Sequence, residues 1–358
     1  MKIYKVIALM SGTSLDGLDI AYIVFNFNDN NINFNIKYAE TIKYEDDILH
    51  EFENVKNALG IELLKSHNFY GSYLGKKVNN FIKINNIKNV DFIASHGHTI
   101  FHQPEINLTF QLGNPAYIAA ETKIKTIGDF RTLDVALNGQ GAPLVPIGDK
   151  LLFPDYDFCI NLGGFANISF DKNNIRYAYD ICPVNIVLNE FAKKQNKIFD
   201  EDGNLGKQGN INKELLDSLN NLDYYKNSYP KSLGKEWLEK YFTNCLLQFL
   251  ISDSDKMRTI YEHIAIQIAN SVNSEKGENI LFSGGGTYNK FLLELIRQKT
   301  EKQIIIPEEK IIDFKESLIF GLLGVLRIEN KINTLASVTG ADIDSIGGCV
   351  YGQALFKI

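Results

Sequence analysis

The sequence predicts an α/β protein made of two similar lobes. Its 358 residues exceed what a single core usually holds, so two domains of ordinary size are expected. Strand-like stretches at 3–9, 19–27 and 32–44 open the chain and predict a β-meander. Short apolar runs separated by glycine and polar turns begin again at residue 158. Two halves that open in the same way indicate duplication of one α/β unit.

After the meander, the first half alternates predicted helices and strands. Apolar residues recur at helical spacing in 46–58 and 62–84. The other expected elements of this half are short strands at 91–94, 100–101 and 110–112, a helix at 115–122 and a strand at 124–128. This alternation predicts an α/β domain.

The second half repeats the pattern. Its expected elements are strands at 158–162, 166–170 and 176–179, helices at 184–194, 212–222, 235–250 and 256–274, a strand at 279–282, a helix at 289–298, a strand at 304–306 and a helix at 315–329. The polar segment 196–212 predicts an exposed loop. Gly and Pro interrupt both helix and strand in 137–146, so we expect an N-terminal lobe of residues 1–140 and a C-terminal lobe of residues 141–358, whose last helix could pack back on the first lobe.

Composition disfavours several classes of function. The net charge of −6 argues against a broad nucleic-acid or acidic-membrane surface. The sequence contains no apolar run of about 18 residues and no signal-peptide pattern, so a cytoplasmic protein is expected. The four cysteines form no C-x-x-C pair, and His96, His98 and His102 have no acidic or cysteine partner at a ligand-like spacing. Neither a disulfide framework nor a zinc site is therefore predicted.

The turn MSGTSLDGLD at 10–19 is the first candidate for a site that binds an anion. Its glycines allow several backbone N–H groups to point at one ligand, and its hydroxyls add donors. Asp16 and Asp19 suit a hydrated Mg²⁺ that accompanies a phosphate. A plain hairpin turn that caps its own backbone explains the same residues. The cofactor-binding candidates in this turn are Gly12, Thr13, Ser14, Leu15, Asp16, Gly17, Leu18 and Asp19.

Two further glycine turns follow predicted strands. NLGGFANI at 161–168 carries Gly163 and Gly164, and FSGGGTYN at 282–289 carries Gly284, Gly285 and Gly286. A helix N-terminus after such a turn favours phosphate. Together the three turns predict a nucleotide site, although each alone could be a tight connection. The sequence contains no G-x-x-x-x-G-K-[ST] and no strand-linked G-x-G-x-x-G, so a P-loop NTPase or a dinucleotide dehydrogenase is disfavoured.

Two side chains stand out for chemistry. Asp180 follows a predicted strand and precedes a helix, a position that projects a side chain at the carboxyl end of a sheet, although an N-cap role explains it too. Arg131 could hold a substrate carboxylate in a bidentate pair. An ion pair with Asp129 or Asp134 is the structural alternative.

Motifs along nearly the whole chain resemble the anhydro-N-acetylmuramic acid kinases. These are MSGTSLDGLD, SHGHTIFHQP at 95–104, QLGNPAYIA at 111–119, GDFRTLD at 128–134, GQGAPLVP at 139–146, NLGGFANI, FSGGGTYN and VTGA at 338–341. Their common order makes coincidence improbable.

The resemblance implies a member of the sugar kinase/Hsp70/actin superfamily. The implied fold is a two-lobed actin-like ATPase (ribonuclease H-like) fold in which each lobe is a mixed sheet opening with a β-meander, with ATP and Mg²⁺ in a cleft between the lobes. The implied reaction opens the 1,6-anhydro ring of anhydro-N-acetylmuramic acid with water and transfers the ATP γ-phosphoryl group to O6. The products are N-acetylmuramic acid 6-phosphate and ADP, made in peptidoglycan recycling by a cytoplasmic homodimer that binds neither nucleic acid nor membrane.

The resemblance also implies residue roles. Asp180 would be the catalytic base, Arg131 would bind the lactyl carboxylate, Glu316 would bind a sugar hydroxyl with His96 also in the substrate site, and Asp16 would hold Mg²⁺ indirectly. The third glycine turn would bind adenosine. For Glu316, a favourable first-turn position in a helix is the alternative.

The sequence departs from the family pattern at three motifs. The usual DTGPGN is DICPVN here, which puts ligand contacts by residues 181–184 in doubt, and His98 replaces the glutamine of SHGQT. In the late helix, Ser317 follows Glu316 where the family usually has alanine. None of these changes removes a group that the mechanism requires.

Two other functions stay open. One is a kinase of the same fold that acts on another sugar or anhydro-sugar such as levoglucosan, which would give Arg131 no carboxylate to bind. The other is a non-catalytic actin-like ATP-binding module.

Overall fold

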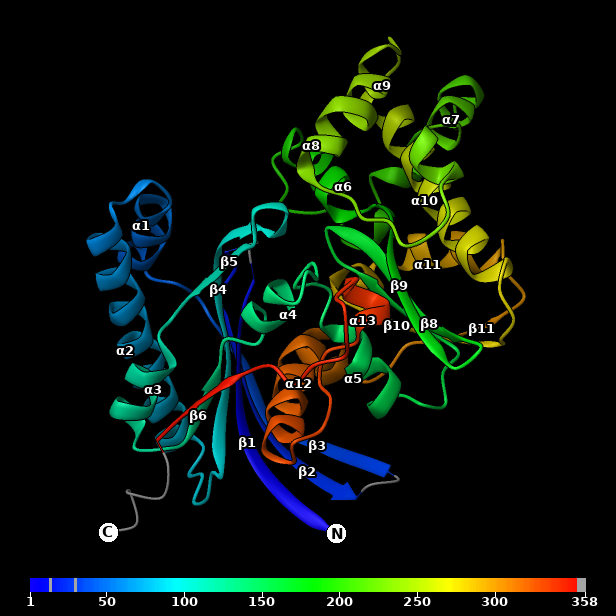
Figure 1. Ribbon diagram of the computed structural model, residues 1–358. Coiled ribbons are helices and arrows are strands. Elements are labelled where there is room, and N and C mark those ends of the chain that lie inside the picture. Colours follow the sequence, from blue (N-terminus) through cyan, green and yellow to red (C-terminus); the bar gives the residue numbers. More distant parts are fainter. Residues whose placement is uncertain (13–14, 29–30, 353–358) are drawn as a thin grey trace. The chain divides into compact units, whose positions relative to one another are not determined.

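The computed structural model describes residues 1–12, 15–28 and 31–352 (Figure 1). The chain forms two compact units, which we call unit 1 (residues 1–153 and 314–358) and unit 2 (residues 154–313). Each unit is built on one mixed β-sheet, so the predicted α/β class with two lobes is confirmed. The chain passes between the units at 153/154 and 313/314, whereas the sequence suggested one boundary at 140/141.

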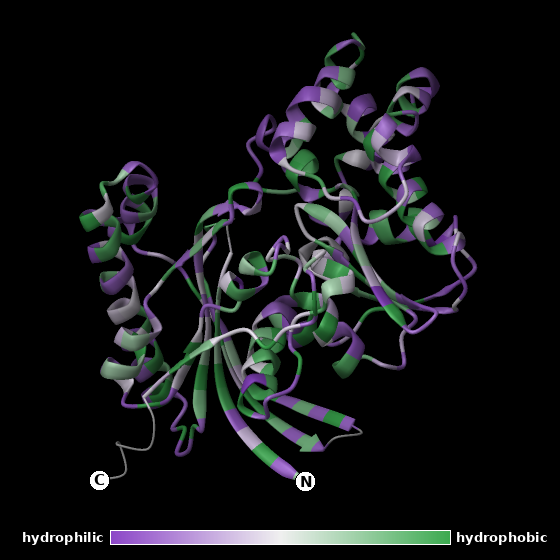
Figure 2. Ribbon diagram, viewed as in Figure 1, coloured by the Kyte–Doolittle hydropathy of each residue, from purple (hydrophilic) through white to green (hydrophobic). Residues whose placement is uncertain are grey.

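The sheet of unit 1 has the strand order β12-β6-β4-β1-β2-β3, with β5 paired to β4. Its strands are β1 (Lys2–Ser11), β2 (Leu18–Asn28), β3 (Asn31–Ile42), β4 (Phe92–Gln103), β5 (Leu108–Leu112), β6 (Thr126–Gly128) and β12 (Cys349–Tyr351). The first three form the expected antiparallel meander, and β4 runs parallel to both β1 and β6. In β3, hydrophobic and hydrophilic residues alternate over much of the strand, as expected for a strand with one buried face, whereas β2 is buried along most of its length (Figure 2).

Helices cover both faces of this sheet (Figure 1). The helices of unit 1 are α1 (Asp46–Asn54), α2 (Gly60–Ile84), α3 (Pro115–Thr122), α4 (Thr132–Ala136), α5 (Val145–Leu152), α12 (Glu309–Ile328, which starts in unit 2) and α13 (Ala336–Thr339), with 3₁₀ turns at Val55–Asn57 and Pro104–Ile106. Tyr70 and Leu74 of α2 share a core cluster with Ile7 and Ile93 of the sheet. On the opposite face, a Cβ at Gly324 of α12 would lie only 2.6 Å from the Phe92 ring, so glycine permits the close packing.

Unit 2 repeats the sheet of unit 1. Its order β11-β10-β7-β8-β9 matches β6-β4-β1-β2-β3, with an antiparallel meander followed by parallel strands. The strands are β7 (Phe158–Leu162), β8 (Phe165–Lys172), β9 (Ile175–Pro183), β10 (Asn279–Ser283) and β11 (Gln303–Ile305). The expected duplication of one α/β unit is therefore present in the topology.

The helices of unit 2 pack on a single apolar core. They are α6 (Asn185–Lys193), α7 (Lys213–Asn220), α8 (Lys235–Trp237), α9 (Asn244–Leu247), α10 (Asp253–Asn273) and α11 (Lys290–Arg297), with 3₁₀ turns at Glu201–Gly203, Gly206–Gln208, Asp223–Lys226 and Gly285–Tyr288. A π-helical segment, Leu238–Thr243, separates α8 from α9 where one helix was expected. The expected exposed loop at 196–212 is wrong in part, because Asp200 and Leu205 are buried and the Asp200 carboxylate accepts the N–H groups of Leu205 and Gly206.

No helix in the described part of the chain is long and apolar enough to cross a membrane.

A buried ion pair explains why the chain from residue 314 onward belongs to unit 1. Lys315 Nζ lies 2.8 Å from Asp149 Oδ1, and both side chains are almost fully buried. The Lys315 ammonium also lies 5.6 Å from the ring centre of Phe153, and a Cβ at Gly148 would lie 2.5 Å from Ile319. The pair therefore joins α5 to α12 directly after the distorted residue Phe314 (φ −115°, ψ 18°).

We expect Lys315→Met to destabilise the protein by about 3 kcal/mol or more, because the variant removes the ammonium that lies against the buried Asp149 carboxylate. Urea unfolding followed by circular dichroism measures the loss. The double variant Asp149→Leu/Lys315→Met should recover most of it.

Lys65→Met is the matched control, since Lys65 pairs with Glu62 on the exposed surface of α2. The free energy of unfolding of this variant should differ from that of wild type by no more than about 0.5 kcal/mol. Equal effects of the two single variants would show that the buried pair has no special role.

Candidate active site

In unit 1, parallel pairing brings the carboxyl ends of β1, β4 and β6 to one edge of the sheet. Ser11 pairs with His98 there after a bulge in β4. Gly97 forms the bulge with φ 75°, and a Cβ on it would lie 2.5 Å from the Leu112 carbonyl oxygen. Only glycine fits this position, so the SHGHT motif sets the geometry at the edge.

The first glycine turn starts at this edge. Thr13 and Ser14 lie outside the described residues. Leu15 adopts φ 60° and donates its N–H to the Gly12 carbonyl, and a Cβ on Gly17 would lie 2.7 Å from the Thr41 side chain. Leu18 is buried at the start of β2.

The two aspartates of the turn differ in surroundings. The Asp16 side chain is exposed, whereas Asp19 is half-buried and accepts the Thr41 hydroxyl at 2.6 Å. Asp16 therefore offers the more accessible carboxylate, of the kind that a hydrated Mg²⁺ accepts.

A buried hydrogen-bonded chain supports Ser11. Its hydroxyl contacts His98 Nδ1 at 2.9 Å and the Tyr44 hydroxyl, which in turn contacts the Tyr70 hydroxyl at 3.0 Å. The His98 ring stacks on Phe52 with 4.0 Å between ring centres. Burial lowers the pKa of His98 to about 4, so the ring is neutral near pH 7.

Arg131 is held by neutral partners. Its Nε donates to His96 Nε2 at 3.0 Å, and its Nη1 donates to the Gly141 carbonyl at 2.7 Å. Within the described ranges Arg131 forms no ion pair with Asp129 or Asp134, and its Nη2 donates to no protein atom. Asp134 instead accepts the Gly141 N–H at 2.7 Å, so it fixes the turn that holds Arg131. Burial lowers the pKa of Arg131 to about 10, which still leaves the guanidinium charged near neutral pH.

His96 orients Arg131, and neither of its ring nitrogens is left to bind a ligand. Its Nδ1 lies 2.8 Å from the Gly97 carbonyl and therefore carries the proton, while Nε2 accepts from Arg131. Burial and the charge of Arg131 hold the pKa of His96 well below its usual value. Both ring nitrogens thus have protein partners.

Glu316 lies on α12, two residues after the distorted Phe314. Its side chain keeps access to solvent, but the surrounding protein removes enough hydration to raise the pKa of the carboxyl. The charges of Arg131 and Lys315 oppose this rise, and the charge of Asp16 adds to it. The structure therefore brings Asp16, Arg131 and Glu316 into one electrostatic neighbourhood.

In unit 2, Asp180 lies at the carboxyl end of β9, next to a bulge at Ile181. The side chain is half-buried, and Oδ2 accepts the Leu233 N–H at 2.8 Å. Oδ1 has no hydrogen-bond partner among the residues that the structure describes. Burial raises the pKa of this carboxyl, and the Leu233 N–H opposes the rise. Asp180 does not cap α6, whose N-cap is Val184 without a side-chain bond, so the structural alternative for Asp180 is excluded.

The second and third glycine turns lie against each other. A Cβ on Gly284 (φ 82°) would lie 2.4 Å from Asn161 Oδ1, and one on Gly286 would lie 2.7 Å from Leu162 Cβ. A Cβ on Gly285 would meet no described residue beyond its chain neighbours within 4 Å, so the backbone of Gly285 is open.

Gly163 and Gly164 form the turn between β7 and β8. The Gly163 carbonyl accepts the N–H of Asn185, and the Gly164 carbonyl accepts the N–H groups of Val184 and Ile186. In the described part of the chain, the N–H groups of the two glycines have no protein partner. They are therefore free to donate to a ligand.

Comparison with known proteins decides the family. A family model described as anhydro-N-acetylmuramic acid kinase matches residues 4–353. The anhydro-N-acetylmuramic acid kinase of Clostridioides difficile (strain 630) is 32% identical over 94% of this chain and 95% of its own length. That of Bacillus cereus (strain ATCC 10987 / NRS 248) is 33% identical over 94% and 96%. This chain belongs to the anhydro-N-acetylmuramic acid kinase family. It is accordingly a kinase, as the sequence predicted.

A solved structure described as the activator of the 2-hydroxyisocaproyl-CoA dehydratase from Clostridium difficile with bound ADPNP aligns over 91% of this chain and 96% of its own. The TM-score is 0.46 and the identity is 13%, and no conclusion rests on this likeness.

The departure DICPVN from the family pattern falls in the core. Ile181, Cys182 and Val184 are buried with at most 2% of their surface exposed. These replacements therefore change the packing behind the second glycine turn.

Sequence reasoning missed the groups that hold the two central side chains. Gly141 and Asp134 fix Arg131, and Leu233 binds Asp180 from 53 residues away in the chain. A cavity of about 180 Å³ in unit 1, lined in part by Ser95 and Asp129, was not anticipated either. Neither Arg131 nor Glu316 lines this cavity.

For His98→Gln, we expect the stability of this family member to depend less steeply on pH. In the unfolded chain His98 takes up a proton near pH 6.5, whereas in the folded protein its pKa is about 4. The free energy of unfolding therefore decreases as the pH is lowered from 6.5 to 4. The contribution of His98 is roughly 3 kcal/mol at most. Glutamine keeps a hydrogen-bonding group for Ser11 but does not titrate.

Urea unfolding at pH 7 and pH 4.5 measures how much the free energy of unfolding of wild type and of His98→Gln changes between the two pH values. His50→Gln is the control, because His50 is exposed on α1. If wild type and His98→Gln lose equal stability on acidification, His98 is not a buried neutral ring in solution.

Proposed function

We propose that this chain uses ATP to phosphorylate and hydrolytically open the 1,6-anhydro ring of anhydro-N-acetylmuramic acid, giving N-acetylmuramic acid 6-phosphate and ADP. Family membership supports the reaction. The observation that carries the mechanism is the Asp180 carboxylate, with one oxygen held by the Leu233 N–H and the other without a partner among the described residues.

Asp180 is proposed as the general base. Its Oδ1 takes a proton from a water molecule whose oxygen attacks C1 of the sugar. The C1–O6 bond breaks as O6 forms a bond to the γ-phosphorus of ATP, which releases ADP. The pKa of Asp180, raised by burial, makes the carboxylate a stronger base than a fully hydrated one.

Arg131 is proposed to bind the lactyl carboxylate of the substrate. The guanidinium is charged, oriented by His96 and Gly141, and has Nη2 available. A planar guanidinium pairs well with a carboxylate. Glu316 is proposed to accept a sugar hydroxyl, and His96 contributes by keeping Arg131 in place.

The glycine turns are proposed to bind the nucleotide. The open N–H groups of Gly163 and Gly164 suit phosphate oxygens, and the open backbone at Gly285 suits the adenosine. The residues of unit 1 fit Mg²⁺, because the Asp16 carboxylate is exposed and lies near the carboxyl of Glu316. A Mg²⁺ ion held by Asp16 through water would neutralise phosphate charge during transfer.

We further propose a cytoplasmic homodimer that acts in peptidoglycan recycling and binds neither nucleic acid nor membrane. The chemistry of the proposed substrate, a cell-wall amino sugar, supports the metabolic role.

Incubation with ATP, Mg²⁺ and anhydro-N-acetylmuramic acid should release ADP and give a phosphorylated sugar, detected by mass spectrometry. Asp180→Asn should lower kcat by at least about 10³-fold, because amide nitrogen and oxygen are poor proton acceptors. Asp217→Asn, an exposed carboxylate of α7, should keep wild-type activity. Full activity of Asp180→Asn would exclude Asp180 as the base.

Arg131 separates the proposed substrate from a neutral anhydro-sugar. We expect Arg131→Lys to raise KM for anhydro-N-acetylmuramic acid by about 10- to 100-fold, as for the loss of a charge-assisted bidentate contact. Activity with levoglucosan, if any, should be unaffected by the variant. Arg297→Lys, on the exposed surface of α11, serves as control. Faster turnover of levoglucosan than of the charged sugar by wild type would favour the alternative acceptor.

A further inference from the structure

We infer that the segment 224–233 is a positioning element for Asp180, and that Lys231 is the residue that keeps this segment in shape. The inference rests on the proposed function, in which Asp180 is the base.

The segment holds Asp180 at three points. The Leu233 N–H donates to Asp180 Oδ2 at 2.8 Å, the Lys231 carbonyl accepts the Asp180 N–H at 3.3 Å, and the Tyr224 hydroxyl donates to the Asp180 carbonyl. Backbone and side chain of one residue are thus fixed by one segment. Movement of that segment would change both the direction of Oδ1 and the hydrogen bond to Oδ2.

Lys231 ties the two ends of the segment together. Its ammonium donates to the Tyr224 carbonyl at 3.2 Å and to the Asn227 carbonyl at 3.0 Å. The same group lies 4.7 Å from the ring centre of Tyr224 and 5.4 Å from that of Tyr179 on β9. A single side chain therefore closes the segment and rests it on the strand that carries Asp180.

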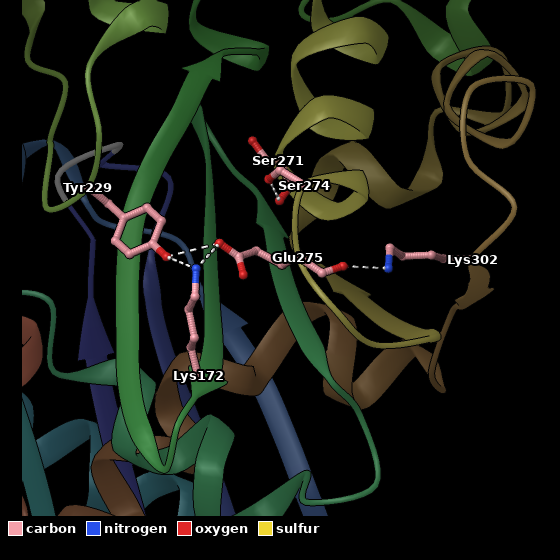
Figure 3. A network of polar contacts seen from close by, with 6 residues as sticks. All are labelled: Lys172, Tyr229, Ser271, Ser274, Glu275 and Lys302. Atoms are coloured by element: carbon pink, nitrogen blue, oxygen red, sulfur yellow. Dashed lines mark hydrogen bonds and ion pairs between the residues drawn. The ribbon is translucent and has the colours of Figure 1, made fainter.

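Tyr229 anchors the middle of the segment to the body of unit 2 (Figure 3). Its hydroxyl donates to Glu275 at 2.9 Å and accepts from Lys172 of β8 at 3.1 Å, while Lys172 also contacts Glu275 at 2.9 Å. Its ring stacks on Tyr179, with centres 5.3 Å apart and planes 3° from parallel. The segment is therefore attached both to Asp180 and to the network of Lys172 and Glu275 at the surface of unit 2.

The electrostatic consequence has a definite sign. The Leu233 N–H favours the ionised carboxylate and opposes the rise in the pKa of Asp180 caused by burial. Among the described residues, Cys182 and Tyr224 are coupled to the charge of Asp180, and burial raises the pKa of both, so neither supplies charge near pH 7. The charged Lys231 ammonium lies over the Tyr224 and Tyr179 rings. Loosening the segment weakens the hydrogen bond, raises the pKa of Asp180 and moves the acid limb of the activity profile to higher pH.

Lys231→Met tests this role. It keeps an unbranched stem over the rings but removes the ammonium. We expect kcat to fall by about tenfold, comparable to weakening one charge-assisted hydrogen bond, with KM for the sugar within about twofold of wild type. The acid limb of kcat against pH should move up by about half a unit or more. Tyr229→Phe, which keeps the ring but loses the surface network, should shift the limb in the same direction by a smaller amount.

The matched control is Lys226→Met. Lys226 belongs to the same segment but pairs only with the exposed Asp223 among the described residues. It should leave kcat and the pH profile unchanged. An unchanged acid limb in Lys231→Met, or an equal change in Lys226→Met, would overturn the inference.

A second substitution tests the donor itself. Replacement of Leu233 by its α-hydroxy acid converts the amide to an ester and removes only the N–H. We expect the same upward shift of the acid limb for this ester variant. If Lys231→Met fails to fold, the ester variant alone tests the inference. No shift with the ester would also overturn the inference.

These outcomes are distinguishable from failure of the proposed function. If Asp180→Asn is inactive while Lys231→Met and the ester behave as wild type, the base is confirmed and the positioning role is wrong. If wild type does not turn over the sugar, a pH titration of the carbon-13 signal of the Asp180 carboxyl still measures how the segment affects its pKa. The Lys231→Met titration should lie at higher pH than that of wild type, and identical titrations would contradict the inference.

Discussion

Parallel strand pairing is the constraint on which the arrangement of the candidate residues within each unit depends. β1, β4 and β6 run in the same direction, so their pairing brings Ser11, His98 and Gly128 to the end of the parallel part of the sheet of unit 1. In unit 2 the same rule brings the ends of β7 and β10 together, and the meander returns β9 to that edge with Asp180. Residues far apart in sequence become neighbours in this way, and Ser11 and His98 also share a hydrogen bond of 2.9 Å.

The charged groups at these edges are held by neutral partners. Arg131 is fixed by a neutral imidazole and a backbone carbonyl, and Asp180 by a backbone N–H. An ion pair would fix them too, but it would neutralise the charges on which the roles proposed for Arg131 and Asp180 depend. A buried ion pair lies elsewhere, at Asp149 and Lys315, where it joins two helices.

Sequence reasoning predicted what local patterns determine. The two meanders and the glycine turns follow from apolar periodicity and turn residues. Asp180, which was predicted to follow a strand, lies inside β9 near its carboxyl end, because the strand continues to Pro183. The sequence analysis named the return of the last helix to the first lobe as an option, but local pattern did not determine the crossings at 153/154 and 313/314, which depend on long-range contacts such as that between Lys315 and Asp149. Burial of Asp200 was missed since a polar, glycine-containing segment looks exposed until its carboxylate finds two N–H partners. The support of Asp180 by Leu233 is a backbone contact, which leaves no trace in side-chain patterns.

The most direct test of the account uses water labelled with oxygen-18. Reaction of anhydro-N-acetylmuramic acid with ATP and Mg²⁺ in this water, followed by rapid mass spectrometry of fragments, locates the incoming oxygen. Attack of water at C1 predicts one labelled oxygen at C1 and none in the phosphate bridge to C6, with hydrolysis and phosphorylation occurring together. Phosphorylated sugar without label at C1, or label in the phosphate bridge, would contradict water attack at C1 and remove the role assigned to Asp180.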